Sequence, residues 1–239
     1  MTEDARVTAL TAAITGGDVD AVRRLVREDP SLASARDGNG LPVLLLALFH
    51  QQRASADALL EAGPELGVLE AAAAGRGERL RELLDSDPDA IRERTPEGFT
   101  TLGLAAFLGG PDPVRVLLDH GADADDDADN PFGVRPVHAA SAAHDHETMR
   151  LLLDAGADPN QRQQGGFVPL HEAAHTDDVE MARLLLDHGA DPSVAADDGR
   201  DAIRIAADDG SAGVAALLVR APASTHGSGG RRSPPGATR

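Results

Sequence analysis

One stretch of the sequence, His171-Glu172-Ala173-Ala174-His175, matches a pattern found in zinc metalloproteases. In those enzymes two His one helical turn apart bind the metal ion, and the Glu activates a water molecule. A zinc-dependent hydrolase that uses His171, Glu172 and His175 is therefore one hypothesis for this chain. Such an enzyme also needs a third ligand and a substrate cleft, and a short helix supplies neither.

A second stretch, residues 123–129, is strongly acidic. Asp123, Asp125 and Asp127 would take the first, third and fifth positions of a calcium-binding loop. The sixth position, where that loop needs Gly, is Ala128, and the twelfth, where it needs Glu, is Val134. The pattern therefore excludes an EF-hand. Two interpretations stay open: a solvated loop tip, and weak binding of a divalent cation.

A third set of candidate ligands is His138, His144 and His146. We expect His138 and His144 to face different ways, which disfavours a transition-metal site. The chain has no cysteine, no G-x-x-x-x-G-K-[ST] motif and no G-x-S-x-G motif. The sequence therefore predicts a protein that is not an enzyme and that binds no metal ion or cofactor.

The elements that carry these residues recur along the chain. Gly133, Gly166 and Gly199 lie 33 residues apart, and each begins a turn, a short Ala-rich segment and a longer Leu-rich segment. A period of this length indicates stacked structural repeats. A six-residue sequence motif recurs with this period in three copies: Leu118-Asp119-His120-Gly121-Ala122-Asp123, Leu153-Asp154-Ala155-Gly156-Ala157-Asp158 and Leu186-Asp187-His188-Gly189-Ala190-Asp191.

Each unit is predicted to form two helices that pack against the neighbouring units. Small residues recur in the first helix, where only small side chains let neighbouring helices approach closely. Leu pairs recur in the second helix, so a continuous apolar core forms only when the units stack. The small pairs are Ala105-Ala106, Ala140-Ser141, Ala173-Ala174 and Ala206-Ala207, and the Leu pairs are Leu117-Leu118, Leu152-Leu153, Leu185-Leu186 and Leu217-Leu218.

Two segments, Val168-Pro169-Leu170-His171-Glu172-Ala173 and Arg135-Pro136-Val137-His138-Ala139-Ala140, resemble the Thr-Pro-Leu-His-x-Ala signature of the ankyrin repeat family. No copy has all four signature residues. The resemblance covers nearly all of residues 1–220 and implies an all-α solenoid whose unit is a β-turn and two antiparallel helices. It also makes His171 a signature residue of the repeat, so the zinc-like pattern is interpreted as a chance match.

The family usually has Gly at the turn between the two helices of a unit. By this resemblance Gly109 matches that turn in one unit, while His144 and Asp177 stand there in the next two. Since Asp and, less often, His tolerate a left-handed backbone, we expect these turns to form.

The repeat organises the chain into one elongated domain and a tail. We predict units near residues 1–37, 38–67, 68–97, 98–132, 133–165, 166–198 and 199–220, followed by a disordered tail at 221–239 that is rich in Pro, Gly and Ser. The unit at 38–67 is short and ends in Gly63-Pro64-Glu65-Leu66-Gly67. A local irregularity is expected there.

The charge limits the classes of partner. The formal net charge is −18 at pH 7, and the tail carries Arg231, Arg232 and Arg239 without any acidic residue. An acidic body repels phosphate backbones and anionic membranes, so we expect neither nucleic acid nor membrane as a partner. The acidity favours encounter with a basic protein surface, although it can also serve solubility alone.

The expected location is the cytoplasm and the expected state is a monomer. Met1-Thr2-Glu3-Asp4 lacks the basic and then apolar layout of a secretion signal, and no stretch approaches the length of a membrane span. Every basic residue other than His is Arg, which together with abundant Ala, Gly and Asp indicates GC-rich coding and a bacterial source.

The resemblance implies a binding surface on the concave side, made of hairpin tips and first helices. Phe99, Phe107 and Phe167 are the expected apolar anchors, although Phe99 and Phe167 could instead pack against neighbouring turns. The tip row is Phe99, Val134, Phe167 and Arg200, and the helix row is Leu104, Phe107, Leu108, Ala142, Glu172, His175, Thr176, Asp208 and Asp209.

The predicted function is therefore a non-enzymatic module that binds another protein, of unknown identity, through this groove. Two alternatives from other classes stay open. One is an acidic decoy or immunity-type inhibitor that blocks a basic protein surface. The other is the zinc-dependent hydrolase described above.

Overall fold

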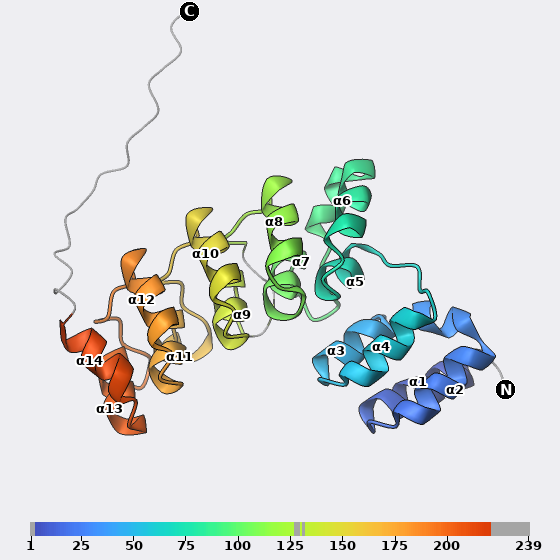
Figure 1. Ribbon diagram of the computed structural model, residues 1–239, viewed down its shortest axis with the longest axis horizontal. Helices are drawn as coiled ribbons and strands as arrows, with labels where there is room; N and C mark the ends of the chain where they lie inside the picture. Colours follow the sequence, from blue (N-terminus) through green and yellow to red (C-terminus); the bar gives the residue numbers. More distant parts are fainter. Residues whose placement is uncertain (1–2, 127–129, 131, 221–239) are drawn as a thin grey trace, which may run out of the picture.

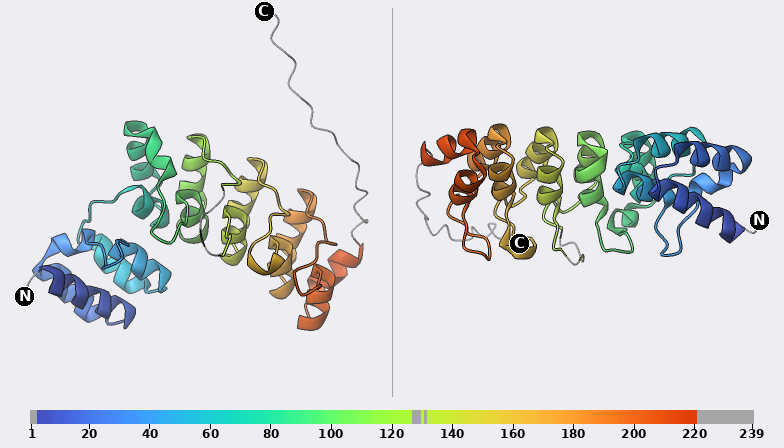
Figure 2. Two further views of the ribbon diagram at one scale, coloured as in Figure 1. Left: turned by 180° about the vertical axis from the view of Figure 1, so that it is seen from behind. Right: turned by 90° about the horizontal axis from the view of Figure 1, so that it is seen from below.

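The computed structural model describes residues 3–126, 130 and 132–220. They form antiparallel helix pairs that follow one another in a row (Figure 1), with connecting segments projecting to one side (Figure 2). The helices are α1 (Glu3–Thr15), α2 (Val19–Glu28), α3 (Val43–Phe49), α4 (Arg53–Glu61), α5 (Val68–Ala73), α6 (Gly77–Ser86), α7 (Thr101–Leu104), α8 (Pro111–Asp119), α9 (Pro136–Ala142), α10 (His146–Asp154), α11 (Pro169–His175), α12 (Val179–Asp187), α13 (Ala202–Asp209) and α14 (Ala212–Arg220).

The predicted all-α solenoid is confirmed. Where the connecting segments fold back, the described residues contain isolated bridges, such as Arg94 to Thr100 and Ala195 to Asp201. One helix pair lies within each predicted repeat range, while the domain boundaries themselves stay a prediction. The expected disordered tail, 221–239, lies outside the described residues, as do Asp127 and Asp129 of the acidic run.

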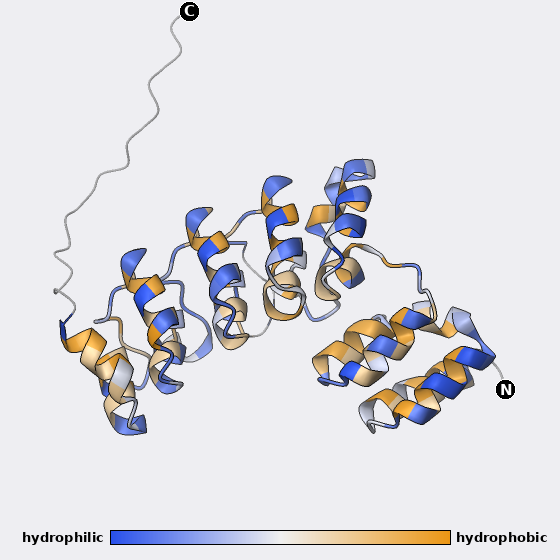
Figure 3. Cartoon of the chain, in the orientation of Figure 1, coloured by the Kyte–Doolittle hydropathy of each residue, from blue (hydrophilic) through white to orange (hydrophobic). Residues whose placement is uncertain are grey.

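None of the helices in the described ranges combines the length and the apolar character that crossing a bilayer requires. Apart from α3, whose residues are all apolar, these helices carry both apolar and polar residues (Figure 3). Helices of this kind bury one side against their neighbours and leave the other in water.

The turn inside each pair requires a backbone with positive φ. His144 (φ 53°) and Asp177 (φ 54°) adopt it, as expected from the sequence. The following Asp then begins the second helix: Asp145 and Asp178 each accept a hydrogen bond from the backbone N–H three residues later. Such a cap satisfies a donor that the first turn of a helix leaves unpaired.

The prediction that Gly109 occupies this turn is wrong, because one extra residue lies in the first helix of that pair. From Pro136 to His144 the positive-φ residue follows the helix start by eight positions, whereas from Thr101 to Gly110 it follows by nine. The extra residue is accommodated as a π turn, η3 (Ala105–Gly109). Insertions of this kind often occur at functional sites.

Gly109 lies where the backbones of two helix pairs approach closely. A Cβ atom added at Gly109 would collide with the carbonyl oxygen of Ala72 in α5 and would lie 2.9 Å from Cγ of Pro113. A backbone oxygen cannot move aside as a flexible side chain can. Only Gly therefore lets η3 pack against α5 in this way.

The expected irregularity near Gly63–Gly67 corresponds to a break in the row. The core of α1–α4, which includes Leu10 and Leu59, is separate from the core that runs from Val68 onward. The helices α4 and α6 diverge (Figures 1 and 2). The two parts are joined on the side of the first helices by a small apolar cluster, which consists of Leu41, Leu45, Leu69, Ala73 and Leu104.

Two His residues link successive second helices. His120 and His188 occupy the C-caps of α8 and α12, where Nδ1 of each lies within 3 Å of a carbonyl oxygen in the last helical turn. Nε2 of each faces a carboxylate of the preceding pair, Asp85 at 3.1 Å and Asp154 at 3.2 Å. The helix carbonyl, followed by the carboxylate, raises the pKa of His120, and the pKa of His188 is likewise raised.

We expect Gly109→Ala to lower the free energy of unfolding by about 2 kcal/mol, the usual cost of inserting an atom into a packed interface. Urea denaturation followed by circular dichroism measures the change. Gly38→Ala is the matched control, because no atom lies within 4 Å of the added Cβ at that exposed site. Equal stability of the two variants would contradict the close approach.

Ala155 is the C-cap of α10 and has no such imidazole, although Asp119 lies exposed at the matching position of the preceding pair. We expect Ala155→His to stabilise the fold by about 0.5 kcal/mol at pH 6. A His whose pKa is higher in the folded state than in the unfolded state stabilises the fold at a pH below its unfolded-state pKa. This stabilisation is lost as the pH rises through its folded-state pKa. The gain should therefore fade by pH 8.5, and a gain independent of pH would contradict this role.

Candidate functional site

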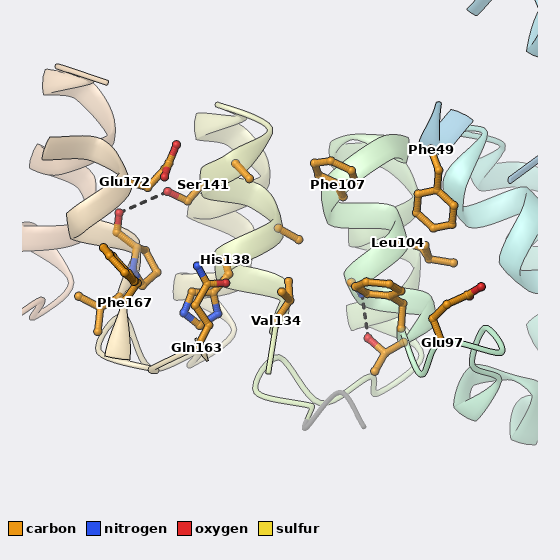
Figure 4. A pocket seen from close by; sticks show the side chains of 17 residues that line it. Phe49, Glu97, Leu104, Phe107, Val134, His138, Ser141, Gln163, Phe167 and Glu172 are labelled. Carbon is orange, nitrogen blue, oxygen red and sulfur yellow. Dashed lines mark hydrogen bonds between the residues drawn. The ribbon is translucent and has the colours of Figure 1, made fainter. Parts of the chain in front are cut away.

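The first helices and the segments that precede them form one face of the row, which we call the groove. A pocket of about 630 Å³ lies in it, within the ~300–1,000 Å³ typical of ligand pockets. Its walls come from α3, α7, η3, α9 and α11 and from the segments before α7, α9 and α11 (Figure 4). Apolar side chains dominate the lining, which includes Phe49, Phe99, Phe107 and Phe167.

Seven of the thirteen residues predicted for the groove line this pocket. Phe107 is 40% exposed, whereas Leu104 is almost fully buried and forms part of the pocket floor. The seven are Phe99, Leu104, Phe107, Val134, Ala142, Phe167 and Glu172.

The other six predicted residues are not among those that line the pocket. Leu108 packs against the small cluster that joins the two parts of the row. The other five are engaged in local contacts: His175 with Asp209 (2.7 Å), Arg200 with Asp198 (2.8 Å), Asp208 with Arg204 (2.9 Å), and Thr176 Oγ1 with the carbonyl of Glu172 (2.9 Å).

Phe99 and Phe167 each contact another aromatic ring, while their role as anchors stays a prediction. The ring of Phe167 meets that of His171 edge-on at 5.7 Å between centroids, and the ring of Phe99 lies 6.0 Å from that of Phe49. Both Phe residues are half-buried by these contacts and still line the pocket.

Sequence reasoning missed Phe49, Glu97 and Gln163, which also line the pocket. A signal for Phe49 existed, since it follows the start of α3 by six positions, as Phe107 follows the start of α7. Phe49 therefore belongs to the same row as Phe107. Because the row is broken after α4, Phe49 reaches a pocket that α9 and α11 also line.

The two signature His residues, His138 and His171, form hydrogen bonds with backbone groups. Nδ1 of His138 accepts a hydrogen bond from the N–H of Arg135 (3.2 Å), and Nε2–H donates to the carbonyl of Gln161 (2.9 Å). His171 repeats the arrangement with the N–H of Val168 and the carbonyl of Val194. Each His thereby ties the start of a first helix to the segment that leads to the next pair.

Burial keeps both imidazoles neutral. His138 is only 5% exposed, and burial lowers its pKa to about 4. Burial also lowers the pKa of His171, which is 1% exposed. Because the carbonyl partner of Nε2 can only accept, the proton resides on Nε2 in both residues.

This geometry does not support the zinc-dependent hydrolase. Both ring nitrogens of His171 are used by backbone groups, so neither is free to bind a metal ion. His175 is exposed, and Nδ1 of its ring lies 2.7 Å from Asp209. Among the described residues, no group of three or more His, Asp or Glu side chains is arranged to hold a metal ion.

The other His candidates face different ways, as expected. His138 is buried, whereas His144 is exposed at the turn before α10. His146 Nε2 lies 2.9 Å from both carboxylate oxygens of Asp178, and His144 Nδ1 lies 3.4 Å from one of them. These contacts bridge neighbouring pairs at the cap of α12.

The described part of the acidic run also makes contacts between pairs. Asp126 forms an ion pair with Arg94 (2.9 Å), and Asp125 accepts a hydrogen bond from the N–H of Asp158 (3.0 Å). Weak cation binding by the whole run stays a prediction, because the run is only partly described.

Comparison with known proteins gives a family match. Residues 68–163 and 137–226 match a model described as ankyrin repeats (3 copies), so that more than half of the chain is covered. The matched region begins at Val68, directly after the break.

Several curated proteins are similar over part of the chain. The human BCL-6 corepressor-like protein 1 is 37% identical over 83 residues (35% of this chain, 4% of that protein). Ankyrin repeat domain-containing protein SAT10 of Stachybotrys chartarum is 31% identical over 165 residues (67% and 8%). Rat cyclin-dependent kinase 4 inhibitor B is 32% identical over 101 residues (41% and 74%). The chain thus spans less than a tenth of the first two relatives.

The neutral state of His138 predicts a loss of stability in mild acid. A His whose folded pKa is lowered favours unfolding as pH falls from its unfolded value, near 6.5, toward its folded value, near 4. We expect this residue to cost the native state about 2 kcal/mol between pH 7 and pH 4.5. The measurement is urea unfolding of wild type and His138→Gln across this range. A stability difference between the two that does not change with pH would contradict burial of a neutral imidazole.

Proposed function

Because this chain belongs to the ankyrin repeat family, we propose that it binds a partner protein in its groove. Its ankyrin-repeat relatives suggest a protein–protein interaction module as the general role. In the proposal, Phe99, Phe107 and Phe167 are the apolar anchors, and the pocket between them receives side chains of the partner.

The observation that carries this proposal is an aromatic ring left in solvent at an apolar pocket. Phe107 is 40% exposed and lines the pocket together with three other Phe residues. Burying a Phe side chain contributes roughly 1.5–3 kcal/mol, and buried aromatic anchors dominate many interfaces. A partner that covered the exposed part of Phe107 would gain a share of this free energy.

The position of Phe107 supports the same proposal. It lies in the π turn η3, which exists because this pair has one residue more than the pairs that follow. Phe107 follows the start of its helix by six positions, as Phe49 does, and both rings line the pocket. The proposed role is non-enzymatic, since His138 and His171 are neutral and fully hydrogen-bonded.

A second candidate is the acidic decoy that blocks a basic protein surface. The net charge of −18 favours it. Binding by dispersed surface charge weakens steeply as salt rises, whereas apolar anchors in a pocket lose much less. The two functions therefore predict different responses to salt and to loss of a Phe ring.

We expect Phe107→Ala to weaken binding of the partner at least tenfold, because an anchor contributes about 2 kcal/mol when it is desolvated. The partner is first recovered by affinity purification from the lysate of the native host, and its dissociation constant is then measured by calorimetry. Phe132→Ala is the matched control, since Phe132 is 53% exposed and is not among the pocket residues. That variant should bind within about twofold of wild type.

Equal binding by wild type and both variants would contradict the groove as the working surface. If about 0.5 M salt also released the partner in that case, the acidic surface would be responsible. Circular dichroism of the two variants provides the check on folding.

A further inference from the structure

The break in the row gives the pocket one of its walls. Leu41 and Leu45 of the second pair pack in one cluster with Leu69 and Ala73 of α5 and with Leu104 of α7. The second pair thereby leans toward the fourth on the groove side. Phe49, at the end of α3, reaches across α5, and its ring lies 6.0 Å from that of Phe99.

The pocket is apolar in its middle and acidic at its ends. Glu97 and Glu172 lie at opposite ends of the lining (Figure 4). Of the described residues that line the pocket, they are the only charged side chains, because His138 is neutral and no Arg is in this lining. Among the described residues, neither carboxylate takes part in an ion pair.

The acids elsewhere on the predicted groove rows are arranged differently. Asp208 pairs with Arg204, and Asp209 pairs with His175. Their charges are therefore partly compensated within the chain. Within the described ranges, the two carboxylates at the ends of the pocket form no such ion pair, so a cation from outside the chain can pair with them directly.

We propose that the partner segment that fills this pocket carries an aromatic or large aliphatic side chain between basic residues. The apolar side chain lies among Phe49, Phe99 and Phe107, and a Lys or Arg on each side meets Glu97 and Glu172. This inference rests on the proposed function, since it specifies the partner of the same groove. Charges at the rim of an interface contribute mainly to selectivity and to the association rate.

The two carboxylates select the sequence of the partner rather than the place where it binds. An apolar segment with acidic or neutral flanks would fill the same pocket but would leave Glu97 and Glu172 unpaired, or would repel them. The apolar middle and the basic flanks are therefore separable in an experiment. A small apolar molecule would respond to the Phe residues and not to the carboxylates.

The test is selection of phage-displayed random 12-residue peptides on the full-length protein. A parallel selection uses the variant Glu97→Gln, Glu172→Gln, which keeps the shape of both side chains. The matched control is Glu28→Gln, Glu61→Gln, which changes the net charge equally at two exposed sites outside the pocket.

We expect wild type and control to enrich peptides in which Lys or Arg flanks an aromatic or aliphatic residue on both sides. The pocket variant should keep the apolar preference and lose the basic flanks. A synthetic consensus peptide should bind the pocket variant about tenfold more weakly than the control, with the difference abolished by about 0.5 M salt.

Three results would overturn the inference, and together they separate it from the proposed function. Wild-type peptides without basic flanks, whose binding is lost in Phe107→Ala, would contradict the role of the carboxylates and leave the groove intact. Peptides that bind Phe107→Ala as tightly as wild type would contradict the groove itself. Equal loss of binding in the pocket variant and the control would assign the basic flanks to the overall charge.

Discussion

Close approach of neighbouring first helices is the contact on which the rest of this structure depends. Ala72, Ala105, Ala140, Ala173 and Ala206 are almost completely buried where successive pairs meet. The stability of a solenoid is approximately the sum of such interfaces between neighbours. The close packing of neighbouring first helices also brings the segments before these helices side by side. The contacts that stabilise the fold therefore also build the groove.

The signature His residues extend this constraint to the groove itself. His138 joins the start of α9 to the carbonyl of Gln161, and the segment that follows carries Gln163 and Phe167 to the pocket. One buried imidazole therefore positions groove residues of its own pair and of the next. This structural role also explains why His171 can match a zinc-binding pattern without being a ligand.

The repeated features could be predicted from the sequence because each pair uses the same interactions. The period located Phe99 and Phe167 on the segments before the first helices, and the turn residues His144 and Asp177 followed from the left-handed backbone that they tolerate. The departures could not be predicted. Whether one extra residue becomes a π turn at Ala105–Gly109, and how far the second pair leans toward the fourth, depend on packing that no periodic pattern records.

These two departures from regularity border the same pocket. Phe107 lies in the π turn and Phe49 lies at the end of α3, beside the break, and the two side chains line the same part of the pocket (Figure 4). Natural proteins tend to depart from local regularity at functional sites. That both the π turn and the break border the pocket agrees with a groove that is shaped by the irregular helix pairs rather than by the regular repeat.

The most direct test of the groove as the working surface is hydrogen–deuterium exchange of the full chain with and without its recovered partner. Backbone amides in a covered surface exchange more slowly. If the partner binds in the groove, exchange slows in residues 97–107, 134–142 and 163–172, with little change in α6, α8 and α10. Protection confined to those second helices, or to the described acidic residues 123–126, would contradict it.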